Sequence, residues 1–156
     1  MQVQLTINGK PTTLTVTGHE TLLEVLRDKL GMTGTKTACQ ETECGTCAVI
    51  IDDKAVLACI SLVANLEGAN VRTIEGLADG DVLHPVQKAF IEHGSAQCGF
   101  CIPGFIMSST ALLEKNPNPT QTEIEYALDG NICRCAGYPK IFEAIRQAGK
   151  EMSKEK

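Results

Sequence analysis

The sequence predicts an α+β protein in which a small mixed domain of strands and one helix precedes an all-helical domain. Apolar residues alternate with polar ones in short runs over residues 1–77, whereas beyond residue 82 they recur with the helical period of 3.6. A short, polar, glycine-bearing segment at 78–82 separates the two patterns and is typical of a linker. We therefore predict one domain at 1–77, a linker at 78–82 and a four-helix domain at 83–156.

The N-terminal domain is predicted to open with a β-hairpin over residues 3–16, which turns at Asn8-Gly9. A capping box at Thr21–Glu24 then begins an amphipathic helix with leucines at 22, 26 and 30, and Gly31 ends it. Three further strands are expected, at 48–51, 55–59 and 71–74. This order predicts one helix packed across a mixed sheet.

Composition argues against several classes of protein. The net charge is −5, with acids scattered among bases, so a nucleic-acid surface is not expected. No apolar run approaches the ~20 residues that a membrane span requires. The N-terminus, Met1 to Gln4, has neither the basic start nor the apolar core of a signal peptide. Reduced thiols without an export signal indicate the cytoplasm.

The first group of cysteines lies in the N-terminal domain. Cys39, Cys44 and Cys47 crowd one loop, and Cys59 follows on a predicted strand that would hold it rigidly. Four residues separate the first two cysteines, two separate the next pair, and eleven separate Cys47 from Cys59. This spacing is typical of a plant-type 2Fe-2S cluster, in which each iron takes two thiolates beside its sulfides. Gly45 would allow the backbone to approach such a cluster closely.

Zinc is the main alternative for this group, since sites of four cysteines are common. Their usual pattern, however, is two short pairs far apart rather than three thiols in one loop. Disulfides are the other alternative for eight cysteines. The lack of a signal peptide and a chain long enough to fold without covalent links argue against them.

The helical domain contains an internal repeat. Its helices are predicted to run from Pro85 to Gly94, from Pro103 to Asn116, from a capping box at Thr120 to Gly130, and from Pro139 onwards, with a charged tail that frays from Lys150. Each half carries two cysteines just before a helix N-terminus, Cys98 and Cys101 in the first and Cys133 and Cys135 in the second. Packing the halves about a local two-fold axis would gather four thiolates under two positive helix ends. By itself this group suits zinc almost as well as a second 2Fe-2S cluster; beside the first group it favours a two-site electron path.

Together these motifs resemble the small iron–sulfur subunit of the molybdenum hydroxylases, the family of xanthine dehydrogenase, aldehyde oxidoreductase and carbon monoxide dehydrogenase. The resemblance covers nearly the whole chain. Its most specific pieces are Cys39 to Cys47 with Cys59, Gln97 to Cys101 followed by Pro103-Gly104, and Gly130 to Cys135 ending in Gly137-Tyr138. It implies a β-grasp, plant-type ferredoxin domain followed by a four-helix domain with pseudo-two-fold symmetry, each holding one 2Fe-2S cluster.

The resemblance also implies a function and a set of site residues. The chain would carry single electrons from a molybdopterin centre through two 2Fe-2S clusters to FAD. A large molybdopterin-binding subunit and a medium FAD-binding subunit would be its partners, in a heterotrimer or a dimer of heterotrimers. The large subunit would oxidise the substrate, xanthine or another purine or an aldehyde, so no catalytic residue is expected in this chain. The implied metal ligands are Cys39, Cys44, Cys47, Cys59, Cys98, Cys101, Cys133 and Cys135, and Gln97 and the backbone around Cys135 would lie against the pterin.

Three residues depart from the family's usual pattern: Ala38 and Thr42 stand where glycine is common, and Ile102 where threonine is frequent. None removes a ligand, so they bear on hydrogen bonding at the first cluster rather than on its existence. The chain has no Gly-x-Gly-x-x-Gly turn and no P-loop, so FAD would bind elsewhere. Two other functions remain open at this point, a free-standing two-cluster ferredoxin and a zinc-stabilised interaction module. Surface or capping roles are expected for His19, His84 and His93.

Overall fold

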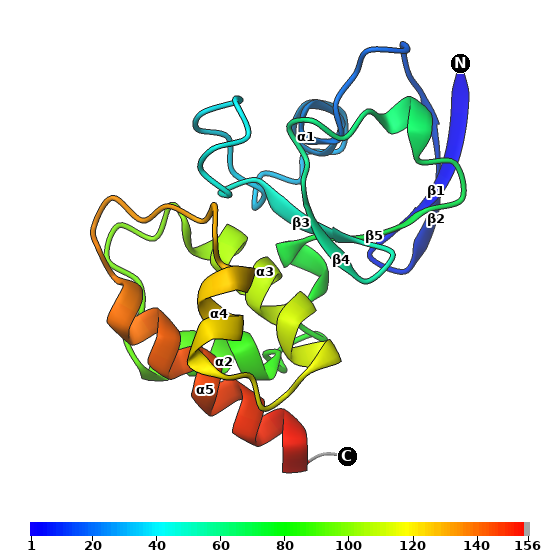
Figure 1. The fold of residues 1–156 in the computed structure, drawn as a ribbon. Coiled ribbons are helices and arrows are strands. Elements are labelled where there is room, and N and C mark those ends of the chain that lie inside the picture. Colours follow the sequence, from blue (N-terminus) through cyan, green and yellow to red (C-terminus); the bar gives the residue numbers. More distant parts are fainter. Residues whose placement is uncertain (155–156) are drawn as a thin grey trace.

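The computed structural model describes residues 1–154, which form a five-stranded mixed sheet beside a group of four helices (Figure 1). The strand order is β2-β1-β5-β3-β4, in which β1 and β5 are parallel and the other neighbours antiparallel. The predicted α+β class is therefore confirmed. The strands are β1 Gln2–Ile7, β2 Lys10–Thr15, β3 Ala48–Ile51, β4 Lys54–Leu57 and β5 Asn70–Arg72.

Both hairpins turn where the sequence predicts a turn. Asn8 and Gly9 join β1 to β2 with φ angles of 49° and 77°, and Asp52 and Asp53 join β3 to β4 with 46° and 65°. Two consecutive left-handed residues match the twist of antiparallel strands, and Asn, Asp and Gly tolerate that conformation best. The alternating apolar residues of β1 are buried, as its pattern predicts.

The helix that crosses the sheet lies where it was predicted but differs in type. Thr21 caps a single turn of α-helix, α1 Leu22–Glu24, through a reciprocal bond with Glu24. The chain then widens into a π-helix, η1 Val25–Lys29, in which the N–H of Leu30 donates to the carbonyl of Val25 over 3.1 Å. All four apolar residues from Leu22 to Leu26 are buried in the core beneath the sheet, so both turns pack on it.

The prediction that Cys59 lies on a strand is wrong. β4 ends at Leu57, and Cys59 occupies the turn that follows. The N–H of Ala58 donates to the carbonyl of Cys47 over 3.2 Å, and its carbonyl accepts the N–H of Leu23 over 3.1 Å. The first bond extends the β3–β4 pairing by one residue, and the second ties the start of the turn to α1. Cys59 is therefore held between the cysteine loop and the helix.

The four predicted helices of the second domain are all present: α2 Pro85–Glu92, α3 Ile102–Lys115, α4 Gln121–Ala127 and α5 Tyr138–Lys154. His84 caps α2 by accepting the N–H of Val86 at its Nδ1, which confirms a capping role. None of the helices in the described residues is long and apolar enough to cross a membrane.

The predicted fraying from Lys150 is wrong, since α5 continues to Lys154. Met152 packs on the apolar core of the helices, and Glu151 lies 3.8 Å from the ammonium of Lys88 on α2. Ser153 donates to the carbonyl of Gly149 over 2.8 Å. Tertiary contacts with α2 and the core thus hold a segment whose charged composition alone predicts disorder.

The sheet and the helices pack directly on each other. Ala48 and Ile50 of β3 meet Met107 and Ala111 of α3 in a small apolar cluster that joins the two larger cores. Figure 1 shows α3 running beneath the end of the sheet that carries β3 and β4. The contact fixes the cysteine loop before β3 relative to the N-terminus of α3.

An ion pair strengthens this contact and leads to a prediction. Arg72 of β5 binds Glu114 of α3 through both guanidinium nitrogens, at 2.7 and 2.6 Å. We expect Glu114→Gln to lower the free energy of unfolding by about 1–2 kcal/mol at pH 7, since a charge-assisted bond contributes roughly 1.5–3 kcal/mol and solvent partly screens this pair, whose side chains are 26 % and 30 % exposed. Urea unfolding would measure the loss. Glu92→Gln is the control, because Glu92 makes only an exposed pair with Lys88.

The same pair predicts a pH dependence. The hydrogen bonds from Arg72 lower the pKa of Glu114 from its usual 4.5. A carboxylate whose pKa is lowered in the folded state contributes stability that is present above pH 4.5 and is lost as the pH falls through the folded value. The wild-type protein and Glu114→Gln should therefore converge in acid. Equal stability of the two at pH 7 would contradict the prediction.

Candidate metal centres

The first cysteine loop is irregular and runs between η1 and β3. Gln40, Thr42 and Gly45 have positive φ angles of 55°, 68° and 66°. Such angles cost a side-chain-bearing residue energy but are free of strain for glycine. Thr42 thus adopts a backbone conformation that favours glycine, and it occupies one of the positions where similar sequences commonly have glycine.

The four thiols of this group lie close enough to influence one another. The N–H of Glu41 donates to Sγ of Cys39 over 3.4 Å, and this bond, with one to Cys44, lowers the pKa of Cys39 to about 7. Burial raises the pKa of Cys47 to about 11, although a hydrogen bond with the backbone of Cys59 acts to lower it. Metals bind the thiolate form of cysteine, so binding of a metal would release the protons of these thiols.

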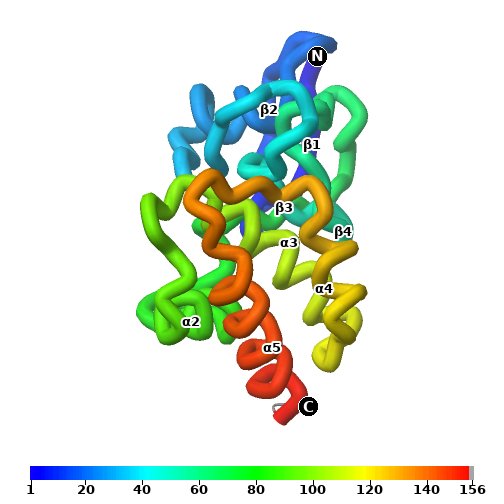
Figure 2. Tube along the Cα trace, turned by 60° about the vertical axis from the view of Figure 1, so that its left-hand side comes forward, coloured from blue at the N-terminus to red at the C-terminus, as the bar shows by residue number. Residues whose placement is uncertain are grey.

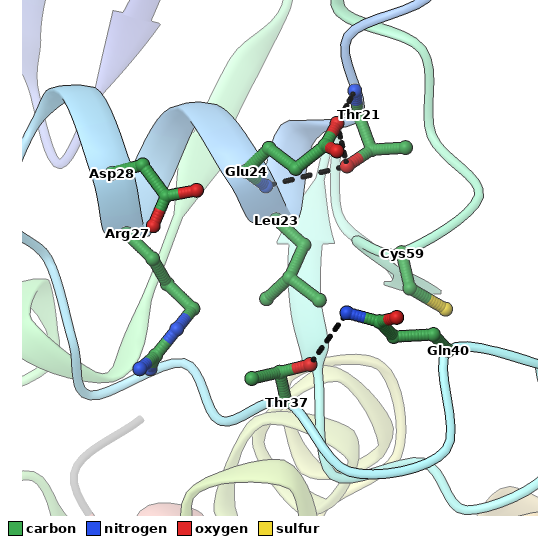
Figure 3. Close-up of a pocket in the computed structure, with 8 residues that line it drawn as sticks. All are labelled: Thr21, Leu23, Glu24, Arg27, Asp28, Thr37, Gln40 and Cys59. Carbon is green, nitrogen blue, oxygen red and sulfur yellow. Dashed lines mark hydrogen bonds between the residues drawn. The ribbon is translucent and has the colours of Figure 1, made fainter.

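A pocket adjoins this loop, between the loop and the helix that crosses the sheet (Figure 3). Its volume is about 390 Å³, and Cys59 and Gln40 lie side by side at one end of it. Arg27 of η1 donates to the carbonyls of Thr33 and Thr35, at 3.0 and 2.7 Å. The arginine therefore ties the start of the cysteine loop to the helix.

The second group of cysteines lies at the starts of α3 and α5. Cys101 is the N-cap residue of α3. Burial raises its pKa to about 12, and a hydrogen bond with Cys133 adds to the rise. Burial also acts to raise the pKa of Cys133, but the N–H of Gly137, which donates to its Sγ over 3.5 Å, and the Cys101 thiol outweigh it, so the pKa is lowered. One cysteine from each half, Cys101 and Cys133, thus meets the other between the starts of α3 and α5.

The remaining residues of this group lie in exposed loops. Cys98 is exposed, and Nε2 of Gln97 donates to the carbonyl of Cys135 over 3.0 Å, which joins the two halves. Phe100 is 47 % exposed. Figure 2 shows the loop before α3 (light green) beside the loop before α5 (orange), both close to the first cysteine loop (cyan).

Direct hydrogen bonds connect the two cysteine groups. The N–H of Ile132 donates to the carbonyl of Cys44 over 3.0 Å, and Thr46 donates through Oγ1 to the carbonyl of Phe100 over 3.2 Å. The side-chain amide of the buried Asn131 donates to the carbonyl of Gly45 over 3.1 Å. Thr46 and Asn131 lie within the cysteine motifs of the sequence, but the sequence does not indicate that they connect the two groups. Each bonds to a residue more than fifty positions away, and only the folded structure shows such a bond.

Two protein-family models match the chain. One describes a 2Fe-2S iron-sulfur cluster binding domain and matches residues 5–78; the other describes a [2Fe-2S] binding domain and matches residues 73–146. The nicotine 6-hydroxylase small subunit of Paenarthrobacter nicotinovorans is 45 % identical over 148 residues, 95 % of this chain and 89 % of the relative. The xanthine dehydrogenase iron-sulfur-binding subunit of Escherichia coli O157:H7 is 43 % identical over 150 residues, 95 % of this chain and 94 % of that one.

The chain belongs to the family of small iron–sulfur subunits of the molybdenum hydroxylases. Its role in that family is electron transfer. Solved structures agree. Quinoline 2-oxidoreductase of Pseudomonas putida 86 superposes with a TM-score of 0.93 at 37 % identity, over 99 % of this chain and 96 % of that one. The aldehyde oxidoreductase of Desulfovibrio gigas gives 0.95 at 40 % identity, over all of this chain but only 18 % of that longer one. Relatives of this iron–sulfur subunit thus occur both as separate subunits and as parts of larger chains.

The residues present in this iron–sulfur subunit suit the two clusters that its family implies. Each group offers four thiols, the ligand set of a 2Fe-2S cluster, and all eight cysteines are free of disulfides. Backbone N–H groups already point at sulfur in both groups, at Cys39 and at Cys133. Among the described residues, no three Cys, His, Asp or Glu side chains lie close enough together to bind a single metal ion.

Proposed function

We propose that this subunit passes single electrons from a molybdopterin centre on a large partner subunit to FAD on a medium one, through two 2Fe-2S clusters. The first would be held by Cys39, Cys44, Cys47 and Cys59, and the second by Cys98, Cys101, Cys133 and Cys135. A bound cluster of this type accepts and releases an electron, and the protein sets its position and its electrostatic surroundings. Gln97 and the backbone at Cys135 would face the pterin.

The observation that carries the proposal is the direct contact between the two cysteine groups. The hydrogen bond from Ile132 to Cys44 places a ligand of the first group one hydrogen bond and one peptide unit from Cys133 of the second. A free-standing ferredoxin needs only the first group, whereas a relay needs two sites held at a fixed separation. The donors near Cys39 and Cys133 would favour the negative charge that each site gains on reduction.

The partners and the substrate extend the proposal beyond this chain. A heterotrimer, or a dimer of heterotrimers, is proposed, with the substrate, a purine such as xanthine or an aldehyde, oxidised on the large subunit. The relatives named for nicotine, nicotinate and quinoline make an aromatic N-heterocycle the second candidate.

We propose that this subunit is located in the cytoplasm, where thiols stay reduced. The division at 78–82 is proposed as the domain boundary, since the buried residues of the first apolar core end at Val71 and those of the second begin at Val86.

The test is to isolate the native complex and measure its metals, its paramagnetic signals and its subunits. About four irons per small subunit and two distinct electron paramagnetic resonance signals after dithionite reduction are expected. Native mass spectrometry should show the two larger partners. Zinc in a colourless protein would instead establish an interaction module, and a two-cluster monomer that never co-purifies with larger chains would establish a ferredoxin.

A further inference from the structure

The two cysteine groups approach each other at two glycines, Gly45 and Gly104, where the structure leaves no room for a Cβ atom. A Cβ added to Gly104 of α3 would collide with the carbonyl oxygen of Gly45 and lie 3.0 Å from Cα of Thr46. A Cβ added to Gly45 would lie 2.5 Å from the carbonyl oxygen of Gly130 and 2.6 Å from Nδ2 of Asn131. Backbone therefore packs on backbone between the groups, and the one side chain among these near contacts is that of the buried Asn131.

Asn131 closes this contact from the other side. The residue is 8 % exposed, and its amide donates to the carbonyl of Gly45, the residue that follows Cys44. Its own N–H donates to the carbonyl of Leu128 over 2.8 Å, which anchors it to the end of α4. Asn131 thus links a fixed point of the helical domain to the middle of the first cysteine loop, two residues before Cys133.

We propose that Asn131 and Gly104 are positioning residues that set the separation of the two clusters, and through it the rate at which an electron passes between them. This inference rests on the proposed function. Both residues act through Gly45, one by a hydrogen bond and the other by close packing. Electron tunnelling slows steeply with distance, so a displacement that leaves every ligand in place would still slow the transfer.

The test compares two variants with two matched controls in the isolated complex. Gly104→Ala places a methyl group against the carbonyl of Gly45, whereas Gly149→Ala places one against the carbonyl of Pro117, where α5 meets the turn after α3. Asn131→Ala removes the amide donor, whereas Asn118→Ala removes an exposed asparagine amide in the turn between α3 and α4. Iron content is measured first for all four.

The readouts are the spin–spin splitting between the two cluster signals in dithionite-reduced protein and the rate at which an electron injected by pulse radiolysis equilibrates between them. We expect full iron content in every variant. Gly104→Ala and Asn131→Ala should weaken the splitting and slow equilibration severalfold, because both the spin coupling and the tunnelling rate fall as the two clusters move apart. Gly149→Ala and Asn118→Ala should match the wild type.

Wild-type splitting and rate in both Gly104→Ala and Asn131→Ala would overturn the inference. Loss of iron from both variants would also overturn it, since these residues would then retain a cluster rather than space two of them. Absence of two signals from the wild-type protein is a separate result, which refutes the proposed function before any variant is made.

Discussion

Replacing Cys47 with alanine is expected to leave about two irons per chain instead of about four and to remove one of two paramagnetic signals, with the other signal unchanged. Cys47 is 3 % exposed, at the end of the loop that enters β3. We expect no other thiol to take its place, because the other three cysteines of the first group are themselves proposed ligands and the second group lies on the far side of the Gly45 contact. Electron delivery to the final acceptor should fall by more than the roughly 10- to 100-fold that loss of even an outer-shell partner of a metal costs.

Cys133→Ala provides the complementary result, removing the second signal and sparing the first. Thr46→Ser is the control beside Cys47, since serine retains the hydroxyl that donates to the carbonyl of Phe100. Iron analysis, resonance spectra and acceptor reduction by the complex measure all three variants. Four irons in Cys47→Ala, or loss of both signals from either cysteine variant, would contradict two independent four-thiol sites.

Local patterns in the sequence predicted most of the fold because the information they carry is itself local. Turns at Asn8-Gly9 and at 52–53, the capping boxes at Thr21 and Thr120, and the apolar period of each helix depend on neighbours within a few residues, and the structure contains every one of them. The grouping of the cysteines could likewise be predicted, since loop spacing and the internal repeat of the helical domain are properties of the chain alone.

The features that the sequence did not predict depend on contacts between distant residues. The apolar period of residues 22–30 does not distinguish a π-helix at 25–29 from an α-helix, and the last turn of α5 is held by Met152 and the pairing of Glu151 with Lys88. The bond between Asn131 and Gly45 spans 86 residues. An asparagine in a Gly-Asn-Ile-Cys segment suggests a turn, and only the packed structure makes it a link between two sites.

Truncation of Phe105 to alanine is expected to be among the most destabilising single changes in the helical domain. The side chain is fully buried in α3 and meets Tyr138 of α5 edge to face, with ring centroids 6.0 Å apart and planes at 75°. A Phe-to-Ala change at a buried site costs about 3–5 kcal/mol, which for a chain of this length lowers the melting temperature by roughly 10 °C.

The loss should reach the second cysteine group, because the hydroxyl of Tyr138 accepts the N–H of Cys133 over 2.8 Å. Without Phe105 the ring has no fixed partner on α3, so the backbone at Cys133 is held less firmly. We therefore expect the signal assigned to the second group to be lost at a lower temperature than the first. Phe100→Ala is the control: its ring is about half exposed, and its carbonyl, which accepts from Thr46, survives the change. Electron paramagnetic resonance spectra recorded after heating at one scan rate would show which signal is lost first. Simultaneous loss of both signals, or equal melting temperatures for Phe105→Ala and Phe100→Ala, would show that the Phe105–Tyr138 ring pair does not support the site.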